Sequence, residues 1–153
     1  MPTVISSESP RTPDVQELLR LGDEFTFALY PAESCYLLDV AELEAPGVTV
    51  FVGRDEGGRA LGMAALVAKD DGSAELKRMF VHEDARGRGL ASALLRAVEG
   101  AASTTGVATL RLETGPLQDA AIALYERAGY TRIPNFGPYV GDPHSVCYAK
   151  DLG

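Results

Sequence analysis

The chain of 153 residues contains no tryptophan, and cysteine and histidine occur only twice each. Cys35 and Cys147 lie far apart in the sequence, and neither belongs to a Cys-x-x-Cys pair. So few thiol and imidazole groups support neither a zinc site nor a disulfide framework. We therefore expect two reduced, packed thiols and no bound metal. His82 and His144 are interpreted as structural residues, because no motif pairs them with other groups.

Long apolar runs and an excess of basic charge are also missing. The longest strongly apolar run covers residues 61–68, far below the length that spans a bilayer. Fourteen lysines and arginines stand against 22 aspartates and glutamates, a formal net charge of -8. This balance argues against a general nucleic-acid surface and is compatible with a cationic amine substrate. The N-terminal stretch lacks the features of a signal peptide, so we expect a cytoplasmic protein that binds neither membrane nor nucleic acid.

The overall composition is that of a globular protein. Hydrophobic residues make up 46% of the chain and charged residues 24%. A chain of this length can form one core and is too short for two domains of ordinary size. We therefore expect one domain over residues 1–153.

Apolar periodicity divides the chain into helical and extended parts. The first part predicts a helix capped by Thr12 and a second, less regular helical stretch over 34–43. From residue 48 the period becomes that of strands, with tight turns at 55–58 and 70–72 that make an antiparallel meander. A strand, a helix and another strand then suggest a right-handed crossover and a parallel strand pair. The predicted strands are 3–6, 48–53, 59–68, 74–81, 107–114, 130–134 and 145–150, and the later helices are 90–104 and 117–128.

These elements predict an α/β (α+β) fold, with a mixed, mostly antiparallel sheet of about six to seven strands flanked by about four helices. An aromatic cluster lies between the first two helical segments. It is more typical of a core than of a ligand pocket, with a substrate wall as the alternative. Its members are Phe25, Phe27, Tyr30 and Tyr36.

The most distinctive stretch is Arg86-Gly87-Arg88-Gly89-Leu90-Ala91, between a strand and a helix. Gly87 and Gly89 let the backbone turn and approach a ligand closely, so that successive N–H groups can converge at the N-terminus of the helix. Two arginines add donors suited to phosphate oxygens. The stretch therefore predicts an anion-binding loop, and an ordinary glycine turn with solvated arginines is the alternative.

Three phosphate-binding loops can be compared with this stretch. The nucleotide-hydrolase loop needs Gly-x-x-x-x-Gly-Lys followed by Ser or Thr, and the chain has no such run. The dinucleotide loop Gly-x-Gly-x-x-Gly/Ala fits Gly87 and Gly89, but Ser92 occupies its third position. The pattern Arg/Gln-x-x-Gly-x-Gly/Ala fits best, at Arg86, Gly89 and Ala91.

This last pattern resembles the acyl-coenzyme A pyrophosphate loop of the GCN5-related N-acetyltransferase (GNAT) superfamily. Residues 74–81 with the loop that follows them are similar to motif A of that family, and residues 124–130 to its motif B. The segments 136–139 and 145–147 are similar to the end of many bacterial members. The resemblance covers essentially the whole chain and is most specific over 74–130. It implies a GNAT-like fold in which the fourth and fifth strands splay apart.

The resemblance implies that acetyl-CoA, the co-substrate, lies in the cleft between the splayed strands. Splaying frees strand N–H and C=O groups for the amide-rich pantetheine arm. Met79 N–H would polarise the thioester carbonyl, and Gln118 stands where many members have an asparagine. The residues implied to contact the coenzyme are Met79, Phe80, Val81, Arg86, Gly87, Arg88, Gly89, Leu90, Ala91, Gln118 and Tyr125.

Acetyl transfer to an amine requires two proton transfers. An alkylammonium with a pKa of ~10.4 has to lose a proton before it can attack, and the resemblance suggests Glu75 as the base, directly or through water. Glu113, at the end of a strand, is a rival base, and pairing with Lys77 is the alternative role for Glu75. Tyr125 matches the general acid of the family, and a place in the core is its alternative role.

The sequence therefore predicts an acetyl-CoA-dependent N-acetyltransferase that acts by direct transfer on a primary amine of a small molecule, amino acid or peptide. A non-catalytic acyl-CoA binding or sensing module is the alternative, which the joint presence of Glu75 and Tyr125 disfavours. A dinucleotide-dependent oxidoreductase fits less well because of Ser92. The resemblance is also compatible with a homodimer.

Overall fold

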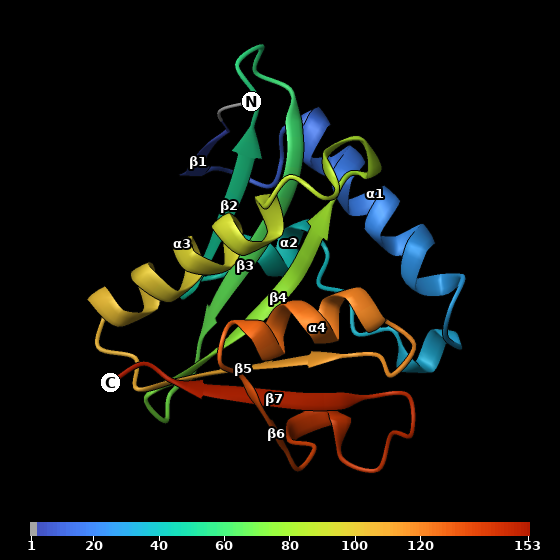
Figure 1. Cartoon of the computed structure of the whole chain (residues 1–153), viewed down its shortest axis with the longest axis vertical. Coiled ribbons are helices and arrows are strands. Elements are labelled where there is room, and N and C mark those ends of the chain that lie inside the picture. Colours follow the sequence, from blue (N-terminus) through green and yellow to red (C-terminus); the bar gives the residue numbers. More distant parts are fainter. Residues whose placement is uncertain (1–2) are drawn as a thin grey trace.

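The computed structural model describes residues 3–153, which form a seven-stranded sheet with four α-helices packed around it (Figure 1). The strand order is β1-β2-β3-β4-β5-β7-β6. The strands are β1 Val4–Ser7, β2 Val48–Arg54, β3 Ala60–Ala68, β4 Ser73–Val81, β5 Thr109–Thr114, β6 Thr131–Ile133 and β7 Val146–Asp151. The helices are α1 Pro13–Phe27, α2 Val40–Leu43, α3 Leu90–Thr104 and α4 Asp119–Arg127.

One pair of neighbouring strands is parallel and the others are antiparallel. β4 and β5 run side by side in the same direction, with Ser73 opposite Thr109 and Leu76 opposite Leu112. The helix α3 connects them, as a crossover requires. The predicted mixed, mostly antiparallel sheet is confirmed, and the predicted bounds of α3 agree with the structure.

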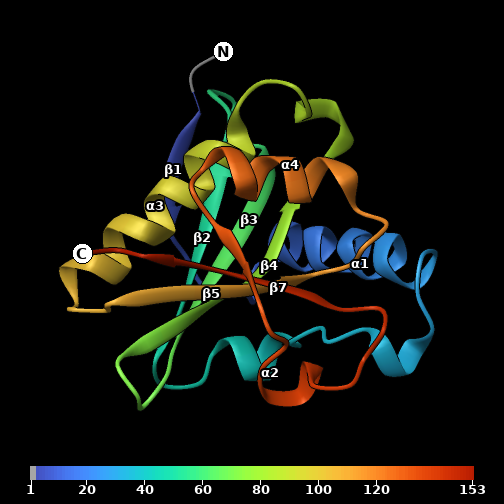
Figure 2. The same cartoon turned by 60° about the horizontal axis from the view of Figure 1, so that its bottom comes forward.

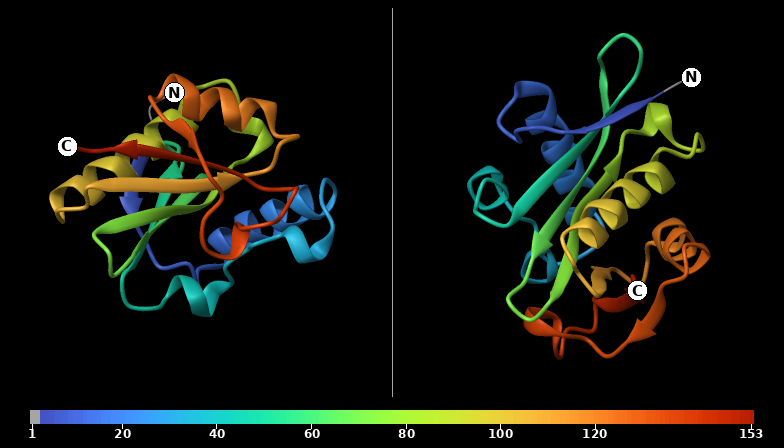
Figure 3. Two further views of the ribbon diagram at one scale, coloured as in Figure 1. Left: turned by 90° about the horizontal axis from the view of Figure 1, so that it is seen from below. Right: turned by 90° about the vertical axis from the view of Figure 1, so that its left-hand side faces the viewer.

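Helices cover both faces of the sheet. Figure 2 and Figure 3 show α3 and α4 on one face and α1 and α2 on the other. The apolar side of α3 buries Leu94, Leu95 and Val98 against the strands. Gly62 of β3 permits this close packing, because a Cβ there would lie 3.0 Å from Leu90 Cδ2. A second core forms between α1, α2 and the opposite face of β2 and β3.

The prediction of a helical stretch over 34–43 is wrong for most of its length. The structure has a single 3-10 turn at Ala32–Ser34, an extended segment, and then the short helix α2. Asp39 and Glu42 begin α2 with a capping box, in which each side chain accepts a hydrogen bond from the backbone N–H of the other residue. Only the end of the predicted stretch is therefore helical.

The extended segment uses its carbonyl groups to bind side chains of β4. Tyr36 O accepts a hydrogen bond from Lys77 Nζ at 3.0 Å. Leu38 O accepts one from Arg78 Nε at 2.9 Å. These hydrogen bonds from charged side chains stabilise the extended conformation of the segment. Their contribution outweighs the weak preference of its sequence for a helix.

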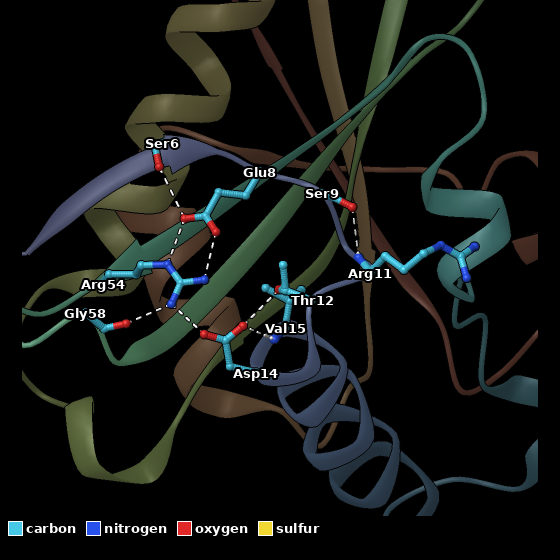
Figure 4. A network of polar contacts seen from close by, with 9 residues as sticks. All are labelled: Ser6, Glu8, Ser9, Arg11, Thr12, Asp14, Val15, Arg54 and Gly58. Atoms are coloured by element: carbon cyan, nitrogen blue, oxygen red, sulfur yellow. Dashed lines mark hydrogen bonds and ion pairs between the residues drawn. The ribbon is translucent and has the colours of Figure 1, made fainter.

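Figure 4 shows the polar contacts that tie the start of α1 to the edge of the sheet. Arg54 of β2 donates to both carboxylate oxygens of Glu8, at 2.8 and 2.9 Å, and to Asp14 of α1 at 2.5 Å. Thr12 occupies the predicted N-cap position, but its hydroxyl donates to Asp14 and caps no backbone N–H. The network holds α1 against the β1–β2 edge.

Within residues 3–153, no helix is both long enough and apolar enough to cross a membrane. The same part of the chain contains no group of three or more His, Cys, Asp or Glu side chains placed to hold a metal ion. Cys147 is buried and Cys35 is half-buried, and both are free thiols in the described chain.

Candidate active site

The strands β4 and β5 separate near the middle of the sheet. Their pairing ends at Leu76 and Leu112, whereas β4 continues to Val81 and β5 to Thr114. Figure 1 shows the two strands diverging, and Figure 2 shows the end of β4 between α4 and α1. The predicted splay is confirmed. Beyond the last pair, the facing edges of the two strands are not bonded to each other and can bind a ligand.

A cavity of about 620 Å³, called the cleft below, opens where the strands separate. Its walls come from the end of β4, from α1, from the loop before α3 and from the start of α4. Most residues that the sequence predicts to contact the coenzyme lie in these walls. They are Met79, Phe80, Val81, Arg86, Gly87, Gly89, Leu90, Ala91 and Gln118.

An irregularity in β4 turns consecutive side chains toward the cleft. The register against β3 shifts between Met63 and Ala65, and Arg78 has a φ of +57°. This conformation is strained for a residue with a Cβ. The Arg78 side chain is held by an ion pair with Asp23 at 2.7 Å. As a result, residues 78–81 all line the cleft, whereas a regular strand would present every second one.

The predicted anion-binding loop lies at the rim of the cleft. Gly87 and Gly89 have φ values of +78° and +80°, and a Cβ on either would meet no atom within 4 Å. The positive φ favours glycine, and the open space beside the N-terminus of α3 suits an anion. The Arg86 guanidinium lies 5.8 Å from the centre of the Phe25 ring. Arg88 is exposed and does not line the cleft.

The wall formed by α4 is set by contacts of the loop that precedes it. The side-chain oxygen of Gln118 accepts a hydrogen bond from Gly115 N–H at 2.9 Å, which leaves its NH2 group for a ligand. Leu117 N–H donates to the Tyr30 hydroxyl at 3.1 Å. A Cβ on Gly115 would lie 1.8 Å from the Tyr30 hydroxyl oxygen. Glycine is therefore the residue that fits between the end of β5 and α4.

A smaller cavity of about 130 Å³, called the inner cavity, adjoins the cleft. Arg78, Met79 and Gln118 belong to the walls of both cavities. Ionisable side chains from several elements meet in the inner cavity. They are Tyr30, Tyr36, Lys77, Arg78, Glu113, Tyr125 and His144.

Lys77 and Glu113 are the first residues after the β4–β5 pairing ends, and the register places them side by side on one face of the sheet. Burial raises the pKa of Glu113, and a hydrogen bond of 2.7 Å from the Ser145 hydroxyl opposes this shift. Burial lowers the pKa of Lys77, against the attraction of Glu75 and Glu113. Burial thus shifts both groups toward their neutral forms.

Tyr125 of α4 is buried, at 4% exposure, and it lines the inner cavity. Its ring packs against Tyr130 with the ring centres 5.9 Å apart. Burial, followed by the charge of Glu113, raises the pKa of the Tyr125 hydroxyl. The hydroxyl therefore stays protonated at neutral pH and can donate a hydrogen bond.

Glu75 lines neither the cleft nor the inner cavity. Its carboxylate accepts a hydrogen bond from the Tyr139 hydroxyl and lies 3.8 Å from Lys77 Nζ. The alternative pairing of Glu75 with Lys77 is thus present. The structure brings Glu113, Lys77 and Tyr125 together and connects Glu75 to them through Lys77.

Sequence reasoning named Lys77 only as a partner of Glu75, and it missed Tyr139 as a member of this cluster. Lys77 lies two positions after Glu75 in β4, and residues two apart in a strand point to the same face of the sheet. The sequence therefore indicated that Lys77 lies beside Glu75. Tyr139 carried no local signal, because it lies 62 positions from Lys77 in the sequence. Of the predicted aromatic cluster, Tyr30 and Tyr36 line the inner cavity.

Comparison with known proteins identifies the family. The family model described as the Acetyltransferase (GNAT) family matches residues 13–130. The chain belongs to this family. The IAA acetyltransferase of Azospirillum brasilense is 40% identical, and the match covers 99% of this chain and 100% of that relative.

Solved structures of GNAT-like proteins share the fold. A Klebsiella pneumoniae protein assigned as an acyl-CoA N-acyltransferase has a TM-score of 0.84 and 34% identity, over 99% of this chain and 98% of that one. The paia N-acetyltransferase of Thermoplasma acidophilum, in complex with coenzyme A, has a TM-score of 0.76 and 16% identity, over 99% of each chain. The match to the GNAT model ends at residue 130, so it contains the cleft, whereas one later residue, His144, lines the inner cavity.

Proposed function

We propose that this GNAT chain is an N-acetyltransferase that moves the acetyl group of acetyl-CoA to a primary amine by direct transfer. One observation carries the proposal. A cleft with an anion-binding loop at its rim adjoins a small polar cavity that contains a carboxylate, Glu113, and a buried hydroxyl, Tyr125. Such an arrangement lets a bound thioester meet an amine at the junction of two cavities, with ionisable groups beside it.

The residues of the cleft fit coenzyme A. The N–H groups of residues 88–91, at the start of α3, suit the pyrophosphate, with Arg86 beside them. The edge of β4 beyond Leu76 suits the amide groups of the pantetheine arm, and Gln118 adds an NH2 donor. Met79 N–H is the proposed donor to the thioester carbonyl, where negative charge develops. The coenzyme A in the Thermoplasma structure supports this assignment.

The acceptor amine has to attack as a neutral nucleophile. An alkylammonium with a pKa of about 10 is charged at pH 7, so a base has to take up a proton. Glu113 lines the inner cavity, and its raised pKa brings it closer to the range in which a base is effective. We favour Glu113 as the first proton acceptor. Glu75 is the alternative base, and it would act through Lys77.

Tyr125 is proposed to stabilise the leaving thiolate. A thiol has a pKa of about 8.5, whereas burial raises the pKa of the Tyr125 hydroxyl above its ordinary value. The hydroxyl is therefore a weaker acid than the thiol, and full proton transfer from it is uphill. We infer that Tyr125 donates a hydrogen bond to the thiolate and remains protonated.

The inner cavity limits the size of the acceptor. Its volume is about 130 Å³, compared with about 620 Å³ for the cleft. It has room for the amine and the few atoms next to it, and its hydroxyl and imidazole groups favour polar atoms there. We propose a small molecule, an amino acid or a peptide as the acceptor.

Calorimetry with acetyl-CoA, together with thiol release across small amines, amino acids and peptides, tests the proposal. The expected result is coenzyme binding with release that depends on the acceptor. Binding without release from any acceptor would favour a non-catalytic acyl-CoA module. Absence of binding would show that the cleft has been misassigned.

Variants then separate the proposed roles. Tyr125→Phe is expected to lower turnover and to leave coenzyme affinity unchanged, and unchanged turnover would remove the role of Tyr125. Glu113→Gln and Glu75→Gln are compared in the same assay. We expect the loss of the base to reduce turnover about 100-fold or more, so the larger loss identifies it.

A further inference from the structure

We propose that Lys77, Tyr139 and Glu75 carry the proton of the acceptor amine from the inner cavity to a separate cavity beside the β3–β4 turn. This third cavity has a volume of about 390 Å³. The inference rests on the proposed function, because the proton is the one that the acceptor loses. The proposed proton path gives a function to this buried polar cluster, which is not required for the transfer of the acetyl group itself.

The three side chains form a continuous and directed hydrogen-bonded chain. Lys77 Nζ donates to the Tyr139 hydroxyl oxygen at 2.8 Å, and that hydroxyl donates to Glu75 Oε2. The other carboxylate oxygen of Glu75 lies 3.4 Å from Lys69 Nζ, and the Lys69 side chain is 45% exposed. Lys77 lines the inner cavity, whereas Glu75 and Lys69 line the third cavity. The chain therefore joins the two cavities.

The central hydroxyl is held firmly in place. Tyr139 is 1% exposed, and its ring packs edge-on against Tyr36 and Phe136, with ring centres 4.8 and 5.2 Å away. The Asn135 side-chain amide donates to Tyr139 O at 3.0 Å, which fixes the turn that carries the ring. A hydroxyl that already lies between a donor and an acceptor can pass a proton without movement of the surrounding heavy atoms.

The charges around Lys77 suit the transfer of a proton. Its ammonium faces the carboxylates of Glu75 and Glu113, with the cations Lys69 and Arg78 nearby. Burial lowers the pKa of Lys77, so its neutral form becomes more accessible. Buried ion pairs seldom stabilise a fold more than apolar residues of the same volume would. Stability alone therefore gives a weak reason for this cluster.

Each step balances in atoms and charge. The Lys77 ammonium gives one proton to the Tyr139 oxygen, while the Tyr139 O–H bond breaks and its proton joins the Glu75 carboxylate. Lys77, now a neutral amine, takes up the proton that the acceptor has released to Glu113. The protonated Glu75 then releases its proton to water in the third cavity. One proton has moved from the acceptor ammonium to solvent, and every protein group has regained its initial charge. Rotation of the Tyr139 O–H bond from Lys77 back toward Glu75 restores the starting direction of the hydrogen bonds.

The test compares ethylamine with 2,2,2-trifluoroethylamine as acceptors at pH 7. Fluorine lowers the ammonium pKa, so trifluoroethylamine is already neutral, whereas ethylamine has to lose a proton before attack. In Tyr139→Phe, thiol release with ethylamine is expected to fall about tenfold or more, and release with trifluoroethylamine to change by less than about twofold. Glu75→Gln is expected to give the same selective loss.

Tyr130→Phe is the matched control. Tyr130 is also buried, at 3% exposure, and its hydroxyl also donates to a carboxylate, Glu99 Oε2, at 2.7 Å. It lines none of the three cavities, so both rates are expected to stay unchanged. Equal losses with both amines in Tyr139→Phe, or no loss, would overturn the proton path and leave acetyl transfer intact. If the parent protein releases thiol with no amine, amino acid or peptide of the panel above, the proposed function itself fails and the proton path falls with it.

Discussion

The contact between Gly115 and Tyr30 makes Gly115→Ala a sharp test of the structure. The new Cβ would lie 1.8 Å from the Tyr30 hydroxyl oxygen and 2.0 Å from Cζ, where ordinary van der Waals contact begins at 3.4 Å. The end of the ring would have to move by about 1.6 Å to relieve the overlap. Tyr30 is 6% exposed and accepts a hydrogen bond from Leu117 N–H, so it has little room to move.

The expected cost follows from these two contacts. Overpacking of this size lies at the upper end of the usual range, about 3 kcal/mol, and loss of the hydrogen bond to Leu117 adds about 1 kcal/mol. For a chain of this length, about 4 kcal/mol lowers the melting temperature by about 8–16 °C. Because Tyr30 lines the inner cavity, acetyl transfer should weaken as well.

Thermal unfolding followed by circular dichroism measures this cost. Gly100→Ala is the control, because a Cβ at Gly100 meets no atom within 4 Å. Tyr30→Leu, combined with Gly115→Ala, should recover part of the loss, with a coupling energy of at least about 1 kcal/mol in a double-mutant cycle. A melting temperature of Gly115→Ala within about 2 °C of the parent protein would refute the close packing of Gly115 on Tyr30.

Three further predictions concern glycine conformation and charge. Gly100→Ala, on the exposed side of α3, should stabilise the protein by up to about 1 kcal/mol in urea unfolding, because alanine favours the helix. Gly89→Ala, at a φ of +80°, should cost about 1–2 kcal/mol of stability and should weaken acetyl-CoA binding in calorimetry, whereas Gly100→Ala should leave binding unchanged. Hydrogen bonds from Arg54 lower the pKa of Glu8 and hold that of Asp14 at about 2. A carboxyl group whose pKa is lower in the folded than in the unfolded state stabilises the fold at pH values above its unfolded pKa. This stabilisation is lost as the pH falls through its folded pKa. The stability difference between the parent protein and Arg54→Met in urea unfolding should therefore be constant at neutral pH and shrink as the pH falls toward about 2.

The cleft and the glycine loop at its rim could be predicted from the sequence because their features are local. The two glycines, the strand before them and the helix after them are contiguous in residues 74–104, and each depends on the conformation of its own segment. The bounds of α3 followed from its apolar period, and the parallel pairing of β4 with β5 followed from the crossover rule. For residues 74–104, the conformational preferences of each segment were therefore sufficient to predict the strand, the loop and the helix.

The inner cavity and its polar cluster depended on tertiary structure. Lys77, Glu113 and Tyr139 come from β4, β5 and a separate turn, and they meet because β4–β5 pairing stops just before the first two. The bulge at Arg78, which no sequence period encodes, decides which side chains enter the cleft. The segment 35–39 is extended because its carbonyl groups bind side chains of β4, although its own period favoured a helix. Burial shifts the pKa values of Lys77 and Glu113, and burial exists only once distant segments have packed together.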